Sequence, residues 1–120
     1  MKIIDMHCDT ISELADRGGE LWKNSGHLDL KRMQESGYLL QNFALFVDIG
    51  KCTSTPWERV CALYEVYRTE LEKNKNRIVP VNPKTLRIKE RTVAAMLEHR
   101  LHFFQTRCRS CSFLRLQPQP

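Results

Sequence analysis

The sequence lacks the features of membrane and secreted proteins. None of its 120 residues form the run of about 20 apolar side chains that a helix needs to cross a bilayer. An acid and a histidine, Asp5 and His7, stand where a signal peptide would need an unbroken apolar core. The five cysteines are odd in number and scattered, which favours reduced thiols over a disulfide framework. We therefore expect a cytoplasmic protein that has no membrane partner.

Glycine and acidic residues are scarce near the carboxyl end. All five glycines precede residue 51, and residues 103–120 contain neither glycine nor acid. Residues 1–81 hold 11 basic and 12 acidic side chains, a net charge of −1, whereas residues 82–120 hold 8 and 2, a net charge of +6. We therefore expect a folded part over residues 1–97 and a basic tail, flexible or aberrant, over residues 98–120.

The chain is also too short for a complete (β/α)8 barrel, which usually needs about 250 residues. Its hydrophobic patterns nevertheless alternate between strand and helix, which indicates parallel βαβ units and an α/β fold. Strands are predicted at residues 2–7, 38–48, 78–81 and 92–97, and helices at 10–17, 30–36 and 55–76. The predicted helix-capping residues are Thr10 (with Glu13 as its capping-box partner), Asp29 and Thr55.

An alternating group of polar residues ends the first predicted strand. Asp5, His7 and Asp9 are two positions apart, so a regular strand places them on one face about 7 Å apart. The His7 imidazole and the Asp9 carboxylate could hold one divalent cation such as zinc. Alternatively, His7 and Asp9 hydrogen-bond at the strand end and cap the next helix. Asp5 could orient His7 without binding the metal itself. Cys8 is expected to point into the core.

Three segments together resemble the membrane (renal) dipeptidase family of zinc peptidases. They are Ile-Asp-Met-His-Cys-Asp-Thr at 4–10, His-Leu-Asp-Leu at 27–30 and Gln-Asn-Phe-Ala-Leu-Phe-Val at 41–47. The His-x-Asp element alone is common among metallohydrolases, but the three segments in this order and spacing are more specific. The resemblance covers residues 1–81, and more weakly 92–97.

This resemblance implies a TIM-type (β/α)8 barrel, of which residues 1–97 would supply the first three to four βα units. It also implies a hydrolase in which two zinc ions share a hydroxide that attacks the peptide bond of a dipeptide substrate. Paired cations lower the pKa of the water and neutralise the developing oxyanion. By position, His7 and Asp9 would be ligands of one zinc. The resemblance identifies no other catalytic residue in this chain.

The sequence departs from the family pattern after residue 97. The family has a bridging glutamate followed by glycine after its fourth strand, whereas Glu98 is followed by a histidine. Glu98 is the nearest candidate for this ligand, and His27 is a candidate for contact with substrate. His99 and His102 are interpreted as surface residues, and we favour no redox or zinc role for the Cys-x-x-Cys at residues 108–111.

One hypothesis for this departure is a shifted reading frame or a truncated gene affecting residues 82–120. The leading functional hypothesis is then an amino-terminal fragment of a zinc dipeptidase, which keeps half of one metal site and is inactive alone. The alternative is a non-catalytic α/β module whose basic tail binds acidic partners without sequence-specific recognition of nucleic acid. A homo-oligomer is compatible with either hypothesis.

Overall fold

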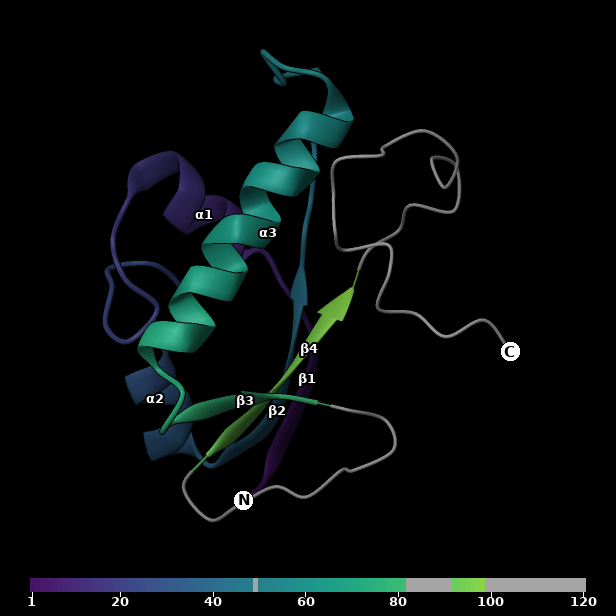
Figure 1. Cartoon of the computed structure of the whole chain (residues 1–120). Coiled ribbons are helices and arrows are strands. Elements are labelled where there is room, and N and C mark those ends of the chain that lie inside the picture. Colours follow the sequence, from purple (N-terminus) through teal and green to yellow (C-terminus); the bar gives the residue numbers. More distant parts are fainter. Residues whose placement is uncertain (49, 82–91, 99–120) are drawn as a thin grey trace.

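The computed structural model describes residues 1–48, 50–81 and 92–98, and their elements alternate between strands and helices (Figure 1). In chain order, the elements are β1 (Ile3–Cys8), α1 (Thr10–Arg17), α2 (Leu30–Ser36), β2 (Tyr38–Ala44), α3 (Pro56–Lys73), β3 (Ile78–Pro80) and β4 (Val93–Glu98). All three strand pairs within these ranges are parallel, so the predicted α/β class is confirmed. Apart from Glu98, the predicted basic tail lies outside the described residues.

Two of the three helices in the described ranges have the predicted N-cap residues. Asp29 accepts a hydrogen bond from the backbone N–H of Arg32 at 2.8 Å, which caps α2. Thr55 and Glu58 form a reciprocal capping box at the start of α3, with Pro56 as the first helical residue. Both arrangements satisfy backbone donors that a helix leaves unpaired at its amino end.

The predicted range of α1 is confirmed, but its predicted N-cap is wrong. Thr10 is the first helical residue rather than the N-cap, and the N-cap position belongs to Asp9. The Asp9 side chain makes no capping hydrogen bond. Thr10 is buried. Its burial depends on packing between elements, which local sequence patterns do not encode.

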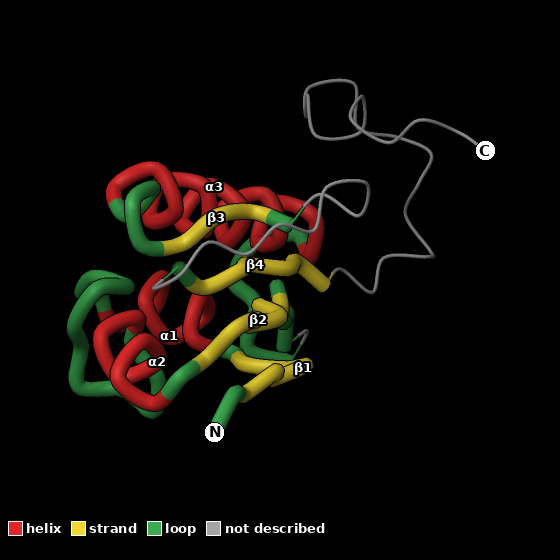
Figure 2. Tube along the Cα trace, turned by 90° about the horizontal axis from the view of Figure 1, so that it is seen from below, coloured by secondary structure: helices red, strands yellow, loops and turns green. Residues whose placement is uncertain are grey.

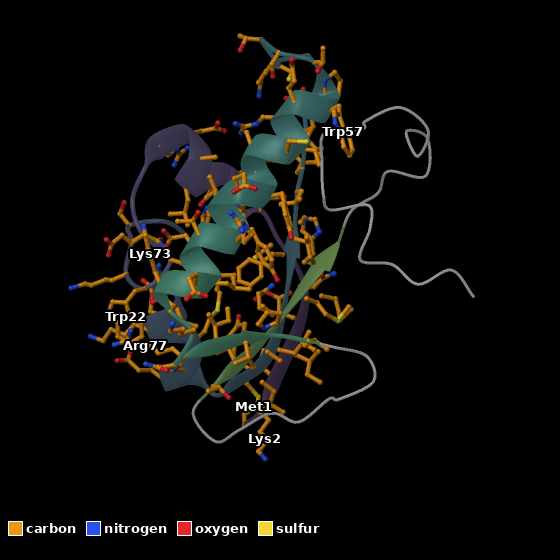
Figure 3. All side chains as sticks on the ribbon, in the orientation of Figure 1. Met1, Lys2, Trp22, Trp57, Lys73 and Arg77 are labelled. Carbon is orange, nitrogen blue, oxygen red and sulfur yellow. The ribbon has the colours of Figure 1, made fainter. Side chains whose placement is uncertain are left out.

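The helices α1, α2 and α3 lie on one face of the sheet (Figure 2). The core between the two layers includes Phe43, Leu63 and Val93, all fully buried, and Phe43 meets the ring of Tyr67 edge to face at 5.8 Å. Burying a side chain of this size stabilises the fold by about 2–3 kcal/mol. At the far end of α3, the guanidinium of Arg77 lies 4.1 Å from the ring centre of Trp22 (Figure 3).

The sheet has the strand order β1-β2-β4-β3. In a (β/α)8 barrel each strand lies beside its neighbours in sequence. The pair β1–β2 follows that rule, but β4 lies between β2 and β3, so the order departs from that of a barrel at β3. No helix within the described ranges is long and apolar enough to cross a membrane.

Candidate functional site

The polar end of β1 lies at the carboxyl edge of the sheet. The strand pairing aligns Cys8 of β1 with Phe43 of β2, and Phe43 with Leu97 of β4. The side chains of His7 and Asp9, on either side of Cys8, are 59% and 49% exposed. Parallel α/β folds bind ligands beyond this edge. Both candidate ligands are therefore open to solvent at the edge where a site is expected.

The side chains of His7 and Asp9 converge. Nε2 of His7 lies 3.4 Å from Oδ1 of Asp9. This separation exceeds the usual N–H···O hydrogen-bond distance of about 2.7–3.2 Å. Nitrogen and oxygen ligands lie about 2.0–2.2 Å from zinc, so two of them on a tetrahedral ion are about 3.4 Å apart. The observed spacing therefore suits two ligands of one cation.

The N-cap positions show what is unusual about Asp9. The other two N-cap residues, Asp29 and Thr55, both accept a backbone hydrogen bond from their own helix. Asp9 occupies the same position at α1 but directs its carboxylate toward His7. The interpretation of Asp9 as a side-chain helix cap is therefore wrong. Its carboxylate remains close to an imidazole, where it can act as a ligand.

Asp5 supports the main chain that carries His7. Its Oδ1 accepts a hydrogen bond from the backbone N–H of His7 at 3.1 Å. The pairing of β1 with β2 shifts register between Asp5 and Cys8, so the strict alternation assumed for the strand does not continue through His7. Asp5 therefore acts on the backbone of His7, through a contact that the regular strand pattern did not predict.

Asn42 is a supporting residue that sequence reasoning missed. It is buried on β2, and its side-chain N–H donates to the carbonyl of Met6 at 3.0 Å. This bond ties the irregular end of β1 to the neighbouring strand. The available signal was a pair of amides, Gln41 and Asn42, within an otherwise apolar strand.

Cys8 is a core residue, as predicted. It is buried and forms no disulfide, and burial raises the pKa of its thiol from 9.0 to about 11. Hydrogen bonds from Thr10 oppose this rise, and the charges of Asp5 and Asp9 add to it. Because zinc binds the thiolate form, a thiol this hard to ionise is poorly suited as a ligand.

Of the other two candidates, only His27 has a described side chain, and it does not join the His7–Asp9 pair in a metal-binding group. Glu98 is the last residue of β4 and pairs with Ala44 of β2, so its backbone lies two strand spacings, about 10 Å, from β1. Its side chain lies outside the described residues. His27 is exposed on the loop between α1 and α2. Among the described side chains, no three His, Cys, Asp or Glu residues form a group that could hold a metal ion.

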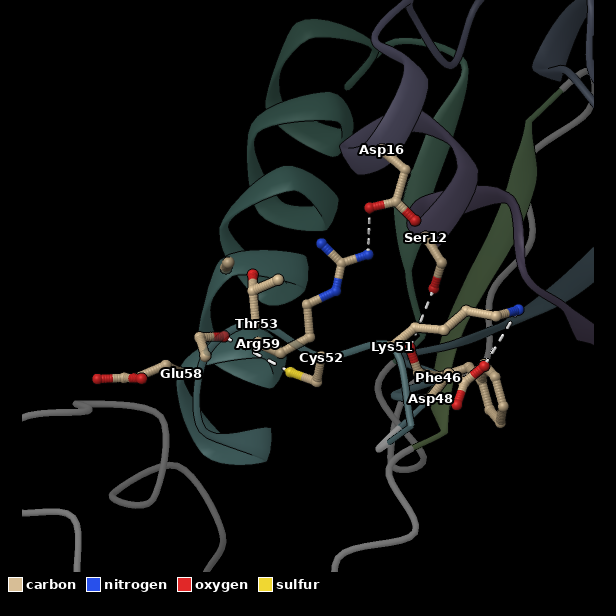
Figure 4. Close-up of a pocket in the computed structure, with 11 residues that line it drawn as sticks. Ser12, Asp16, Phe46, Asp48, Lys51, Cys52, Thr53, Glu58 and Arg59 are labelled. Carbon is tan, nitrogen blue, oxygen red and sulfur yellow. Dashed lines mark hydrogen bonds and ion pairs between the residues drawn. The ribbon is translucent and has the colours of Figure 1, made fainter.

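A separate cavity of about 430 Å³ lies between α1, the chain that follows β2 and the start of α3 (Figure 4). Four of its charged groups form two ion pairs: Arg59 lies 2.6 Å from Asp16, and Lys51 lies 3.3 Å from Asp48. Neither His7 nor Asp9 lines this cavity. It is therefore distinct from the His7–Asp9 pair.

No protein-family model matches the chain, and no curated protein sequence matches it. The dipeptidase resemblance therefore depends on the three sequence segments alone.

Proposed function

We propose that the chain is the amino-terminal part of a zinc-dependent dipeptidase in which His7 and Asp9 hold one cation. One observation carries the proposal: the carboxylate of Asp9 leaves its helix uncapped and lies 3.4 Å from Nε2 of His7. A nitrogen and an oxygen donor at the carboxyl edge of a parallel sheet suit a catalytic zinc.

The arrangement of the layers supports a barrel as the parent fold. In a (β/α)8 barrel, helices cover the outer face of the sheet and apolar side chains fill the interior. Here the helices also share one face, and the apolar residues Leu40 and Ala94 pair outside the core that the helices cover. We therefore propose that the chain supplies the first three to four βα units, although the position of β3 departs from the barrel order.

The described residues fit half of a metal site. Zinc usually takes four ligands, and the chain brings two suitable donors together. When bound, zinc supplies Lewis-acid catalysis and an activated water. His7 and Asp9 would hold the ion, while Asp5 fixes the backbone of His7. Glu98, at the end of β4, is the candidate for a further ligand.

A zinc titration tests this site. In competition with a chromophoric chelator, we expect the chain to bind zinc, and His7→Ala or Asp9→Ala to weaken zinc binding at least about 100-fold. Even residues that only hydrogen-bond to the ligands contribute about 10- to 100-fold to metal affinity. His27→Ala is the matched control, because it removes another exposed histidine. Unchanged zinc affinity in both site variants would contradict the proposal.

Peptidase assays should show little activity from this chain alone. Two protein ligands leave the metal and its water incompletely positioned, and a catalytic zinc normally keeps three protein ligands. We expect hydrolysis of a panel of dipeptides by the purified zinc-loaded chain to stay at the level of His7→Ala. Rapid cleavage that a chelator abolishes would show instead that this chain completes the site.

The charge distribution favours a second candidate function, binding of acidic partners by the basic residues beyond 81. That part has a net charge of +6, whereas residues 1–81 have −1. We expect such binding to nucleic acid to weaken steeply with salt and to be insensitive to sequence. Deleting residues 100–120 should abolish it, and His7→Ala should leave it unchanged.

For either function we propose a cytoplasmic location, where the free thiols of Cys8, Cys52 and Cys61 would stay reduced.

A further inference from the structure

The His7–Asp9 pair lies at the end of β1, a strand at the border of the sheet. Within the described residues, β1 pairs with β2 alone, so its other edge faces outward. Two apolar side chains of the same strand, Ile4 and Met6, are 62% and 55% exposed. Half of a metal site therefore lies beside exposed apolar groups on an outer strand.

The opposite border of the sheet is less suited to protein contact. Backbone bonds from Val81 to Ala95 and from Val93 to Arg77 show that residues 77 and 81 of the β3 region face β4. The backbone N–H and C=O groups of residues 78 and 80 therefore point away from β4, toward the outer edge of the sheet. Pro80 has no N–H, and the N–H of Ile78 already donates to Asn74 at 3.0 Å. Neither offers a donor to an added strand, which leaves β1 as the border for association.

We propose that a second copy of this chain completes the metal site. This inference rests on the proposed cation site. A two-fold axis beside His7 would bring its imidazole and the Asp9 carboxylate next to the same two groups of the second copy, giving the four donors that zinc prefers. An axis at this place that runs parallel to β1 would also bring the exposed side chains of Ile4 and Met6 against their counterparts.

Charge explains why this association would depend on metal. Two Asp9 carboxylates brought to one axis repel each other, and a single Zn²⁺ balances their combined charge of −2. The four donors also match zinc in kind, as two nitrogens and two oxygens. Zinc should therefore link the copies, and removing it should separate them.

Sedimentation and metal analysis test the proposal together. The full chain, carrying Cys108→Ser and Cys111→Ser so that those thiols do not bind metal, should sediment as a 14.1 kDa monomer with chelator. With zinc it should double in mass and bind half a zinc per chain. His7→Ala and Asp9→Ala should abolish both effects, and His27→Ala neither.

The outcomes separate this inference from the proposed site. One zinc per monomeric chain, lost in His7→Ala, would overturn the dimer but keep the site. A dimer and a zinc content that His7→Ala and Asp9→Ala both leave unchanged would overturn both. Ile4→Lys tests the contact, because it places like charges near the axis while keeping both ligands. It should reduce zinc-induced dimer at least tenfold, with an unchanged circular dichroism spectrum confirming the fold. An unaffected dimer would contradict an interface at β1.

Discussion

At the scale of single residues, neighbouring side chains at the end of β1 have opposite environments. Cys8 is buried in the core, whereas His7 and Asp9 on either side of it are about half exposed. The sequence predicted the separation of Cys8 from the two polar residues, because alternation along a strand indicates opposite faces. It did not predict the register shift before Cys8 or the hydrogen bond from Asn42 to Met6, since both depend on how β1 pairs with β2.

The buried thiol predicts an alkaline loss of stability. Burial holds the pKa of Cys8 near 11 in the folded chain against 9.0 for the ordinary thiol. Because the pKa is higher in the folded chain, the Cys8 thiol contributes about 3 kcal/mol to the free energy of unfolding below pH 9. This contribution is lost between pH 9 and 11. Urea unfolding across this range should show a smaller decline for Cys8→Ala than for the parent chain. Cys52→Ala is the control. A decline in the free energy of unfolding that is as large in Cys8→Ala as in Cys52→Ala would contradict the burial of Cys8.

At the scale of elements, capping separates what sequence can predict from what it cannot. Asp29 and Thr55 cap as predicted, because the acceptor and the backbone donor that it binds are three residues apart in the chain. The N-cap of α1 was mispredicted, because Thr10 is instead a buried residue of the helix itself. Asp9 was considered as a cap, but its side chain faces His7. The burial of Thr10 and the contact of Asp9 with His7 therefore override the local capping signals at the candidate site.

Two aspartates at N-cap positions should consequently respond differently to substitution. Asp29→Ala removes a capping bond and the 2.8 Å ion pair with Arg32, and should lower the free energy of unfolding by about 1–2 kcal/mol. Asp9→Ala removes no capping bond and should change the free energy by less than about 0.5 kcal/mol without metal. Urea unfolding with chelator present measures both. A similar loss in Asp9→Ala would show that Asp9 does cap α1.

At the scale of the whole molecule, the sequence predicts the class of fold better than the arrangement of its strands. The alternation of strand and helix patterns predicted a parallel α/β sheet, which the structure has. The position of β4 between β2 and β3 was not predictable, because it depends on packing between distant segments. The same limit applies to the candidate site: spacing identified His7 and Asp9, but only the fold shows that their donor atoms converge.

The central claim is that the imidazole of His7 and the carboxylate of Asp9 bind one cation. X-ray absorption at the zinc edge of the loaded chain tests it most directly, because it reports the atoms around the metal. We expect nitrogen and oxygen ligands at about 2.0–2.1 Å, with an imidazole signal that disappears in His7→Ala. Sulfur ligands at about 2.3 Å, or an imidazole signal unchanged in His7→Ala, would contradict it.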